Sequence, residues 1–138
     1  ERAYRAFIAE WAFKHPSPWD FFATFERFAE RDLDWFWTSF YYQTWVLDQA
    51  VGAVTKGAEA TVIVIEDHGF APMPARVRIQ TTRGGLLERV VPVETWLAGA
   101  DQAEITLPAS VGEVTRVEID PQGLFPDLRP QDNVWIGP

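Results

Sequence analysis

The only run of side chains with metal-ligand chemistry is Glu66-Asp67-His68. Successive residues of a strand point to opposite faces, so Glu66 and His68 could share one side, whereas Asp67 could not. Two ligands fall short of the three or four that protein zinc sites use. The second histidine, His15, lies far away in the sequence. We therefore interpret this run as the polar end of a strand that precedes a turn at Gly69.

Motifs for hydrolysis or phosphate binding are absent from the sequence. There is no HExxH, no CxxC and no glycine-rich phosphate loop. Ser17, Ser39 and Ser110 lack the GxSxG surroundings of a nucleophile elbow, and two histidines offer little material for a catalytic triad. The sequence therefore predicts no catalytic, cofactor-binding or metal-binding residue within these 138 residues.

Two further patterns have a structural explanation that we prefer. Asp32 and Asp34 resemble paired carboxylates, but residues two apart do not share a helix face. Capping and a favourable charge in the first helical turn account for them. The aromatic run from Trp35 to Tyr42 could form a stacking platform for sugars or bases. Aromatic residues at helical spacing are more typical of a packed core, which is the role that we predict for this run.

The charge balance excludes some classes of partner. Lys and Arg total 12 and Asp and Glu total 20, so the net charge is −8. An acidic chain without a basic cluster is poorly suited to bind nucleic acid or an anionic membrane. Arg76, Arg78 and Arg83 could form a short basic strip, which we interpret as a solvated face. No apolar run approaches the roughly 18 residues of a membrane span.

The elements that must position these residues change along the chain. Sixteen of the 20 aromatic residues precede Val51, whereas most Val and Ile residues and eight of the ten prolines follow it. This distribution predicts helices first and strands after. We expect an α+β fold, with about three helices in a short bundle over residues 1–43 and an antiparallel β-sandwich over residues 44–138.

The first predicted helix occupies Glu1–Lys14 and stops at His15-Pro16, because proline disfavours helical geometry in the residue before it. Its apolar stripe consists of Tyr4, Phe7, Ile8 and Trp11. The third predicted helix also has apolar residues on two sides, and such a helix is normally covered on both. We expect the first and third helices to pack against a neighbour in addition to the β-sandwich.

The second predicted helix has the clearest start signal. Ser17 can cap it, Pro18 suits the first helical position, and Asp20 can return its carboxylate to the cap amide. The third helix opens at Asp32, a second cap candidate, and continues through Phe40.

Short extended segments follow at the spacing of a sandwich. They are Trp45–Val54, Val62–Ile65, Val77–Ile79, Leu87–Val93, Ile105–Leu107 and Val114–Ile119. Hairpin turns are expected at Thr55-Lys56-Gly57 and Arg83-Gly84-Gly85. The continuous apolar run Val62–Ile65 predicts a strand that is buried on both faces. Asp120-Pro121 closes the last strand, and a proline-rich tail follows.

Several of these segments resemble the C-terminal part of the M1 family of zinc aminopeptidases. They are Ala12–Phe22 with Phe25-Glu26, then Asp32–Trp37, Trp45–Val51, Ile119-Asp120-Pro121, Phe125-Pro126-Asp127 and Asp132-Asn133. The similarity covers nearly the whole chain and is most specific from Tyr4 to Val51. It departs from the family at Ala29-Glu30, where a small residue and glycine are usual, and at Phe40, where tryptophan is common.

The resemblance implies that residues 1–43 are the last helices of a catalytic domain and that residues 44–138 are an immunoglobulin-like β-sandwich. In that family an HExxH helix and a further glutamate bind zinc, and the motif glutamate is the general base for the metal-bound water. A tyrosine stabilises the tetrahedral intermediate. All these residues lie upstream of the matched region, so none is carried over to this chain, and zinc is expected only in the upstream domain.

Two functions remain open at this level. The first is a scaffold fragment of a zinc-dependent metallopeptidase, whose partner is the upstream catalytic domain. The second is a stand-alone β-sandwich module that binds a ligand without catalysis. Because Glu1 is first and Met73 is the only methionine, we expect a processed or truncated chain. Exposed aromatic helix faces should then cause self-association, since large apolar patches are uncommon on soluble monomers.

Overall fold

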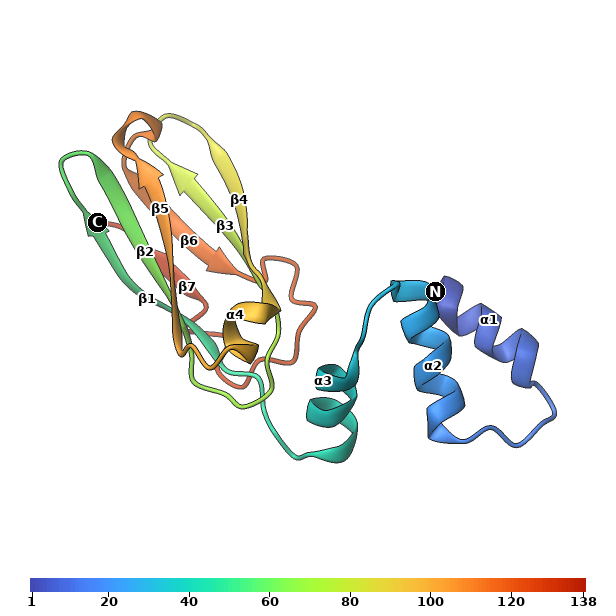
Figure 1. The fold of residues 1–138 in the computed structure, drawn as a ribbon. Helices are drawn as coiled ribbons and strands as arrows, with labels where there is room; N and C mark the ends of the chain where they lie inside the picture. Colours follow the sequence, from blue (N-terminus) through green and yellow to red (C-terminus); the bar gives the residue numbers. More distant parts are fainter. The chain divides into compact units, whose positions relative to one another are not determined.

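The change from aromatic to β-branched residues coincides with a change of structure in the computed structural model, which describes residues 1–138. Residues Glu1–Gln43 form a helical unit and residues Thr44–Pro138 form a β unit (Figure 1). The fold is α+β, with two antiparallel sheets in a sandwich-like arrangement. None of the helices combines the length and the apolar character that crossing a bilayer requires.

The helical unit begins with three α-helices and ends in a π-helical turn. These elements are α1 (Arg2–Trp11), α2 (Pro18–Ala29), α3 (Asp34–Trp37) and η1 (Thr38–Tyr42). The backbone N and the Oγ of Ser17 both donate to Asp20 Oδ2, at 2.8 and 2.7 Å, and thus form the predicted cap of α2. These bonds lower the pKa of Asp20, so their contribution to stability is lost as the pH falls through that lowered value.

The first helix is shorter than the sequence predicted. It ends at Trp11 rather than at Lys14, because Ala12 has extended backbone angles and Phe13 has a left-handed φ of 63°. Lys14 Nζ donates to the carbonyl oxygen of Glu10 at 2.6 Å, which satisfies an acceptor at the helix end. Pro16 therefore lies beyond the end of the helix and does not terminate it.

The third helix is a single α turn that passes directly into a π turn. Its N-cap is Leu33, which makes no side-chain cap bond, rather than the predicted Asp32. Asp32 Oδ1 instead accepts the backbone N–H of Asp34, the first residue of α3, at 2.7 Å. The change of helix type at Thr38 was not expected from the sequence. Ser39 Oγ donates to the carbonyl oxygen of Trp35 at 2.7 Å within this segment.

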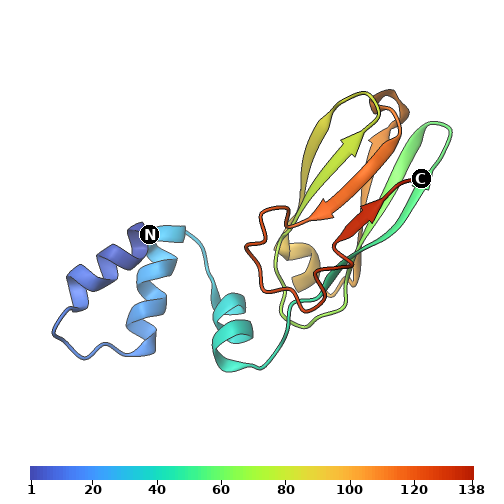
Figure 2. The ribbon, with the colours of Figure 1, turned by 180° about the vertical axis from the view of Figure 1, so that it is seen from behind.

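The β unit contains seven strands and one short helix. These elements are β1 (Gln49–Lys56), β2 (Ala60–Asp67), β3 (Ala75–Thr81), β4 (Leu86–Val91), α4 (Val93–Leu97), β5 (Gln102–Pro108), the 3₁₀ turn η2 (Ala109–Val111), β6 (Val114–Ile119) and β7 (Val134–Ile136). One sheet has the order β1-β2-β5 and the other has the order β4-β3-β6-β7, with every pair antiparallel. The two sheets form two layers (Figures 1 and 2).

The core lies between these layers, where alternate residues of the strands meet. Its fully buried members include Ile63 and Ile65 on β2, Leu107 on β5, Ile79 on β3 and Val117 on β6. The alternation on β3 confirms the prediction of a strand with one wet face. The run Val62–Ile65 is different from its prediction, because Val62 and Val64 remain partly exposed on the outer face.

Several boundaries of the β unit differ from those predicted, beginning with β1, which starts at Gln49 rather than at Trp45. Thr55 and Lys56 still belong to β1, so the hairpin turn begins two residues later than predicted, at Gly57. The predicted strand up to Val93 ends at Val91, and Pro92 then caps the unexpected helix α4. The proline-rich tail also contains β7, whose three residues pair with β6 at the edge of the sheet.

Candidate functional site

The run Glu66-Asp67-His68 closes β2 and divides its side chains between two environments. His68 Nε2 lies 3.1 Å from Glu66 Oε2, so these two residues share a side as expected. Asp67 is half-buried, and burial raises its pKa to about 6, with the negative charges of Asp48 and Asp127 adding to this rise. The run therefore places Glu66 and His68 on one side of the strand. The carboxyl group of Asp67 instead lies near the carboxylates of Asp48 and Asp127.

Replacing Asp67 with asparagine should stabilise the β unit at neutral pH. A folded-state pKa above the unfolded value means that protonation favours folding, so stability falls as the pH rises from about 4 to 6. The full shift corresponds to about 3 kcal/mol, and solvent screening of this half-exposed group reduces the expected gain to about 1 kcal/mol at pH 7.5. Urea unfolding monitored through strand amides by NMR measures the free energy of unfolding.

The matched control for this substitution is Asp101→Asn, which neutralises an exposed carboxylate beside the same strand end. It should leave the free energy of unfolding unchanged within about 0.5 kcal/mol. At pH 4 the Asp67→Asn variant and the native chain should be nearly equal in stability. An equal effect of Asp67→Asn at pH 4 and pH 7.5 would contradict the assigned pKa.

A second acidic group, which sequence reasoning missed, lies at the start of β1. Oxygens of Asp48, Asp127 and Asp132 lie within 4.8 Å of one another. An arginine already occupies this cluster, because Arg129 Nε and Nη2 donate to the two carboxylate oxygens of Asp48 at 3.0 and 2.8 Å. Asp48 is only 5% exposed, so this bidentate pair compensates a buried charge.

The same cluster attaches the segment before β7 to β1. Asp127 Oδ2 accepts the backbone N–H of Gln49 at 3.0 Å, and Asp127 Oδ1 accepts that of Arg129 at 2.8 Å. Backbone bonds join Leu128 to Leu47 and Val51 to Asp132. Only the pairing of segments far apart in the sequence creates this arrangement. We therefore assign the cluster a structural role.

The serines and histidines are not assembled into a nucleophilic site. Ser17 caps α2 and Ser39 is buried with its hydroxyl on a backbone carbonyl. Ser110 follows the end of β5 that pairs with Ala60, whereas His68 follows the opposite end of β2. Ser110 and His68 therefore lie at opposite ends of the paired strands, and the hydroxyl of Ser17 donates to Asp20 rather than to the nearby His15.

Of the three arginines that could have formed a basic strip, Arg76 and Arg78 share one face of β3, whereas Arg83 lies apart from them. Arg78 on β3 is flanked across the sheet by Glu88 of β4 and Glu118 of β6. Its Nη2 lies 3.6 Å from Glu88 Oε1. Arg83 lies in a turn and donates to the carbonyl oxygen of Ser110 at 2.6 Å. This part of the sheet therefore carries both positive and negative side chains and is not a basic surface.

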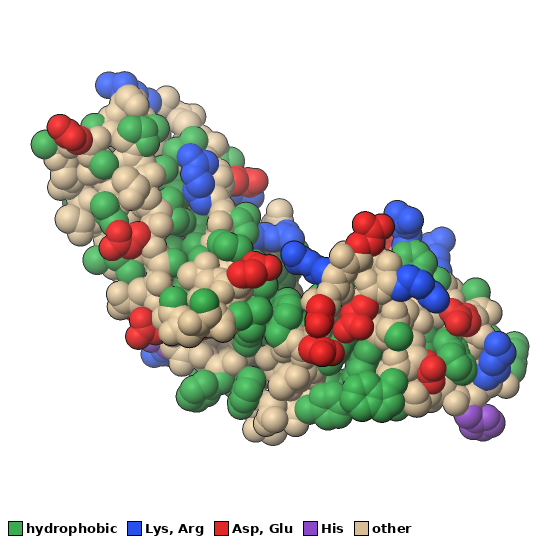
Figure 3. Space-filling model, viewed as in Figure 1, with side chains coloured by type: hydrophobic (Ala, Val, Ile, Leu, Met, Phe, Trp, Pro, Cys, Tyr) green, Lys and Arg blue, Asp and Glu red, His purple; other side chains and the backbone are tan.

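The aromatic residues of the helical unit are only partly a core. Phe22 and Trp37 are buried and stacked, with ring centroids 4.4 Å apart. No residue of α1 is buried. The large apolar side chains that remain exposed in this unit are Tyr4, Ile8, Phe13, Trp19, Phe28, Tyr41 and Tyr42. Hydrophobic side chains are visible at the molecular surface (Figure 3). The prediction of a packed core therefore fails for Tyr41 and Tyr42.

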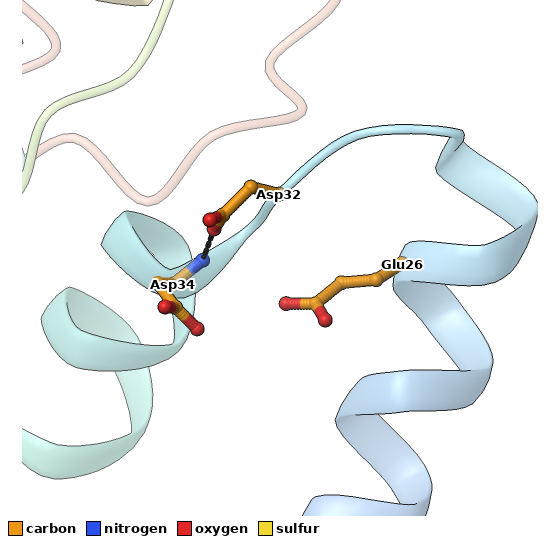
Figure 4. Close-up of side chains that lie close together, drawn as sticks. All are labelled: Glu26, Asp32 and Asp34. Carbon is orange, nitrogen blue, oxygen red and sulfur yellow. Dashed lines mark hydrogen bonds between the residues drawn. The ribbon is translucent and has the colours of Figure 1, made fainter.

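One cavity of about 640 Å³, which we call the aromatic hollow, lies between α2, α3 and η1. Its lining residues are Trp19, Phe22, Ala23, Glu26, Asp34, Trp37, Thr38 and Tyr42. Glu26 extends from α2 toward Asp32 and Asp34 at the start of α3 (Figure 4). Oxygens of these three carboxylates lie within 4.8 Å of one another, and such exposed acidic groups are common without a metal ion.

The chain matches no family model, no curated protein and no solved structure. The helical unit exposes large apolar side chains and contains the aromatic hollow. The β unit contributes an ordered scaffold whose acidic cluster already holds the cationic side chain of Arg129.

Proposed function

We propose that this chain is the C-terminal scaffold part of a zinc-dependent metallopeptidase of the M1 aminopeptidase type. In this proposal residues 1–43 are the terminal helices of the catalytic domain, in a short helical bundle. Residues 44–138 are the immunoglobulin-like β-sandwich that follows. Peptide bond hydrolysis belongs to the whole protein, and the zinc site lies in its upstream catalytic domain.

The observation that carries the proposal is the absence of any buried residue on α1. This helix has an apolar stripe that includes Tyr4 and Ile8, yet both side chains are about half exposed. The helical unit, Glu1–Gln43, is close to the size below which a core alone rarely stabilises a fold. The helical unit therefore needs a covering polypeptide, and the resemblance to M1 aminopeptidases supplies one, the catalytic domain.

The arrangement of the strands also supports the proposal. Under the proposal, the sheets of order β1-β2-β5 and β4-β3-β6-β7 would be the A-B-E and C′-C-F-G strands of an immunoglobulin-like sandwich. A stand-alone β-sandwich that binds ligands through aromatic rings has less support. Trp45 and Phe70 are the only exposed aromatic residues of the β unit.

The test compares the chain with the product of the complete reading frame. We expect the sequence encoded upstream of Glu1 to contain HExxH and a further glutamate ligand. The complete protein should hold one zinc ion per molecule by elemental analysis and cleave an aminoacyl reporter. The 138-residue chain alone should do neither. Tight stoichiometric zinc in the chain alone, or a reading frame without HExxH, would contradict the proposal.

A further inference from the structure

The aromatic hollow combines ring faces with carboxylates and has no positively charged side chain in its lining. The rings of Trp19, Trp37 and Tyr42 line it together with the carboxylates of Glu26 and Asp34. The face of an aromatic ring carries a partial negative charge that attracts cations. The hollow therefore offers two kinds of negative group to any side chain that enters it.

The structure of the helical unit fixes one of the two carboxylates in place. Glu26 Oε1 accepts the indole N–H of Trp37 at 3.0 Å and the backbone N–H of Leu33 at 3.3 Å. Both donors use the same oxygen, so Oε2 retains its capacity to accept a hydrogen bond from a ligand. Glu26 and Asp34 have oxygens within 4.8 Å of each other, and a cation between them would relieve their repulsion.

Two of the rings that line the hollow are exposed. Trp19 stacks on Tyr42 with centroids 6.0 Å apart and planes inclined by 30°. Trp19 is 66% exposed and Tyr42 is 51% exposed, so both rings remain accessible to a ligand. A cavity of about 640 Å³ is far larger than a metal ion, and aromatic rings form much of its wall.

The chemistry of the lining favours a guanidinium group over the alternatives. Arginine stacks on aromatic faces, and its forked N–H groups match carboxylate oxygens, whereas the ammonium of lysine is a compact and strongly hydrated charge. We propose that the aromatic hollow receives an arginine side chain of the polypeptide that covers the helical unit. This inference rests on the proposed function for the identity of that polypeptide, the upstream catalytic domain.

The test uses the complete 138-residue chain and a pair of synthetic peptides. One is acetyl-Gly-Gly-Arg-Gly-Gly-amide, and the other has citrulline, which is neutral and nearly isosteric, in place of arginine. Binding is measured from the NMR shifts of the indole N–H signals of Trp19 and Trp37 during titration. We expect the citrulline peptide to bind roughly fivefold more weakly or not at all, because it lacks the charge.

Variants of the chain locate the binding. The double substitution Glu26→Gln and Asp34→Asn should weaken arginine-peptide binding at least as much as citrulline does. The amide oxygen that Glu26→Gln introduces can still accept the indole N–H of Trp37, so the unit should stay folded, as its NMR spectrum would report. The control Glu30→Gln removes one negative charge from the same unit outside the hollow and should leave the dissociation constant unchanged.

Three results would overturn the inference. They are equal binding of both peptides, unchanged binding by the double variant, and the same indole shifts produced by calcium or zinc salts alone at lower concentration than the peptide. If the chain does not bind the arginine peptide, the zinc-peptidase proposal is unaffected, because the reading frame and the zinc content test that proposal separately.

Discussion

Replacement of Arg129 with alanine is expected to lower the free energy of unfolding of the β unit clearly more than replacement of an arginine in an exposed ion pair. The substitution leaves the carboxylate of Asp48, which is 5% exposed, without the two hydrogen bonds that Arg129 donates to it. An unpaired buried charge is strongly destabilising, and the access of water around the exposed Arg129 side chain moderates the loss. Urea unfolding monitored through the amides of β1 and β6 measures it.

Two further variants separate this charge effect from a loss of packing. Asp48→Asn in the Arg129→Ala background should recover much of the loss, because it removes the unpaired charge. Arg116→Ala is the matched control, since Arg116 forms a 3.4 Å pair with Glu118 at a partly exposed site. Its expected cost is below about 1 kcal/mol. Equal losses for Arg129→Ala and Arg116→Ala would show that the buried pair has no special role.

Replacement of Gly69 with alanine is expected to destabilise the β unit by about 3 kcal/mol or more. The substitution acts at the corner where the end of β2 meets the start of β1. A Cβ atom at this position would lie 2.3 Å from the carbonyl oxygen of Val46 and 2.8 Å from the amide nitrogen of Asp48. Both are backbone atoms, so no side-chain rotation relieves the overlap. The backbone bond from His68 to Asp48 holds the two segments together at 2.8 Å and would have to lengthen.

The matched control is Gly85→Ala, which adds the same methyl group in another turn of the β unit. Its Cβ would come no closer than 3.4 Å to any atom, the Oγ1 of Thr81. We expect a change in the free energy of unfolding within about 0.5 kcal/mol. Differential scanning calorimetry and hydrogen exchange at β1 provide independent measurements. A Gly69→Ala chain as stable as the native one would mean that the corner adapts more readily than its contacts indicate.

Both substitutions act where the start of β1, the end of β2 and the segment before β7 meet. The resemblance to M1 aminopeptidases includes Trp45–Val51 and Phe125-Pro126-Asp127, which belong to this corner. Under the proposed function its role is structural, since it fixes the end of the sandwich nearest in sequence to the helical unit. We therefore expect these variants to affect stability of the β unit rather than chemistry.

Local features of the fold could be predicted because short-range interactions determine them. Ser17, Pro18 and Asp20 define the start of α2 through bonds between near neighbours in the sequence. The alternation on β3 depends only on which side chains are apolar. Strand ends at Asp120 and turns rich in glycine follow from backbone preferences of the same range.

Other boundaries could not be predicted, because competing local interactions decide them. The left-handed backbone of Phe13 ends α1 before the proline that was expected to end it. A strand was expected to reach Val93, but Pro92 instead starts α4. The tail was expected to lack a strand, yet β7 forms because β6 offers a free edge. An edge of this kind exists only after the sheet has assembled.

The sequence by itself determined the division into an aromatic helical part and a β-rich part, the net charge of −8 and the absence of catalytic motifs. Periodicity and composition depend only on the order and types of residues along the chain, so they can be determined without knowledge of the fold. Tertiary structure alone decided that Arg129 neutralises Asp48 and that Glu26 and Asp34 meet beside Trp37. Those encounters join residues from different elements, and only packing determines which of them become neighbours.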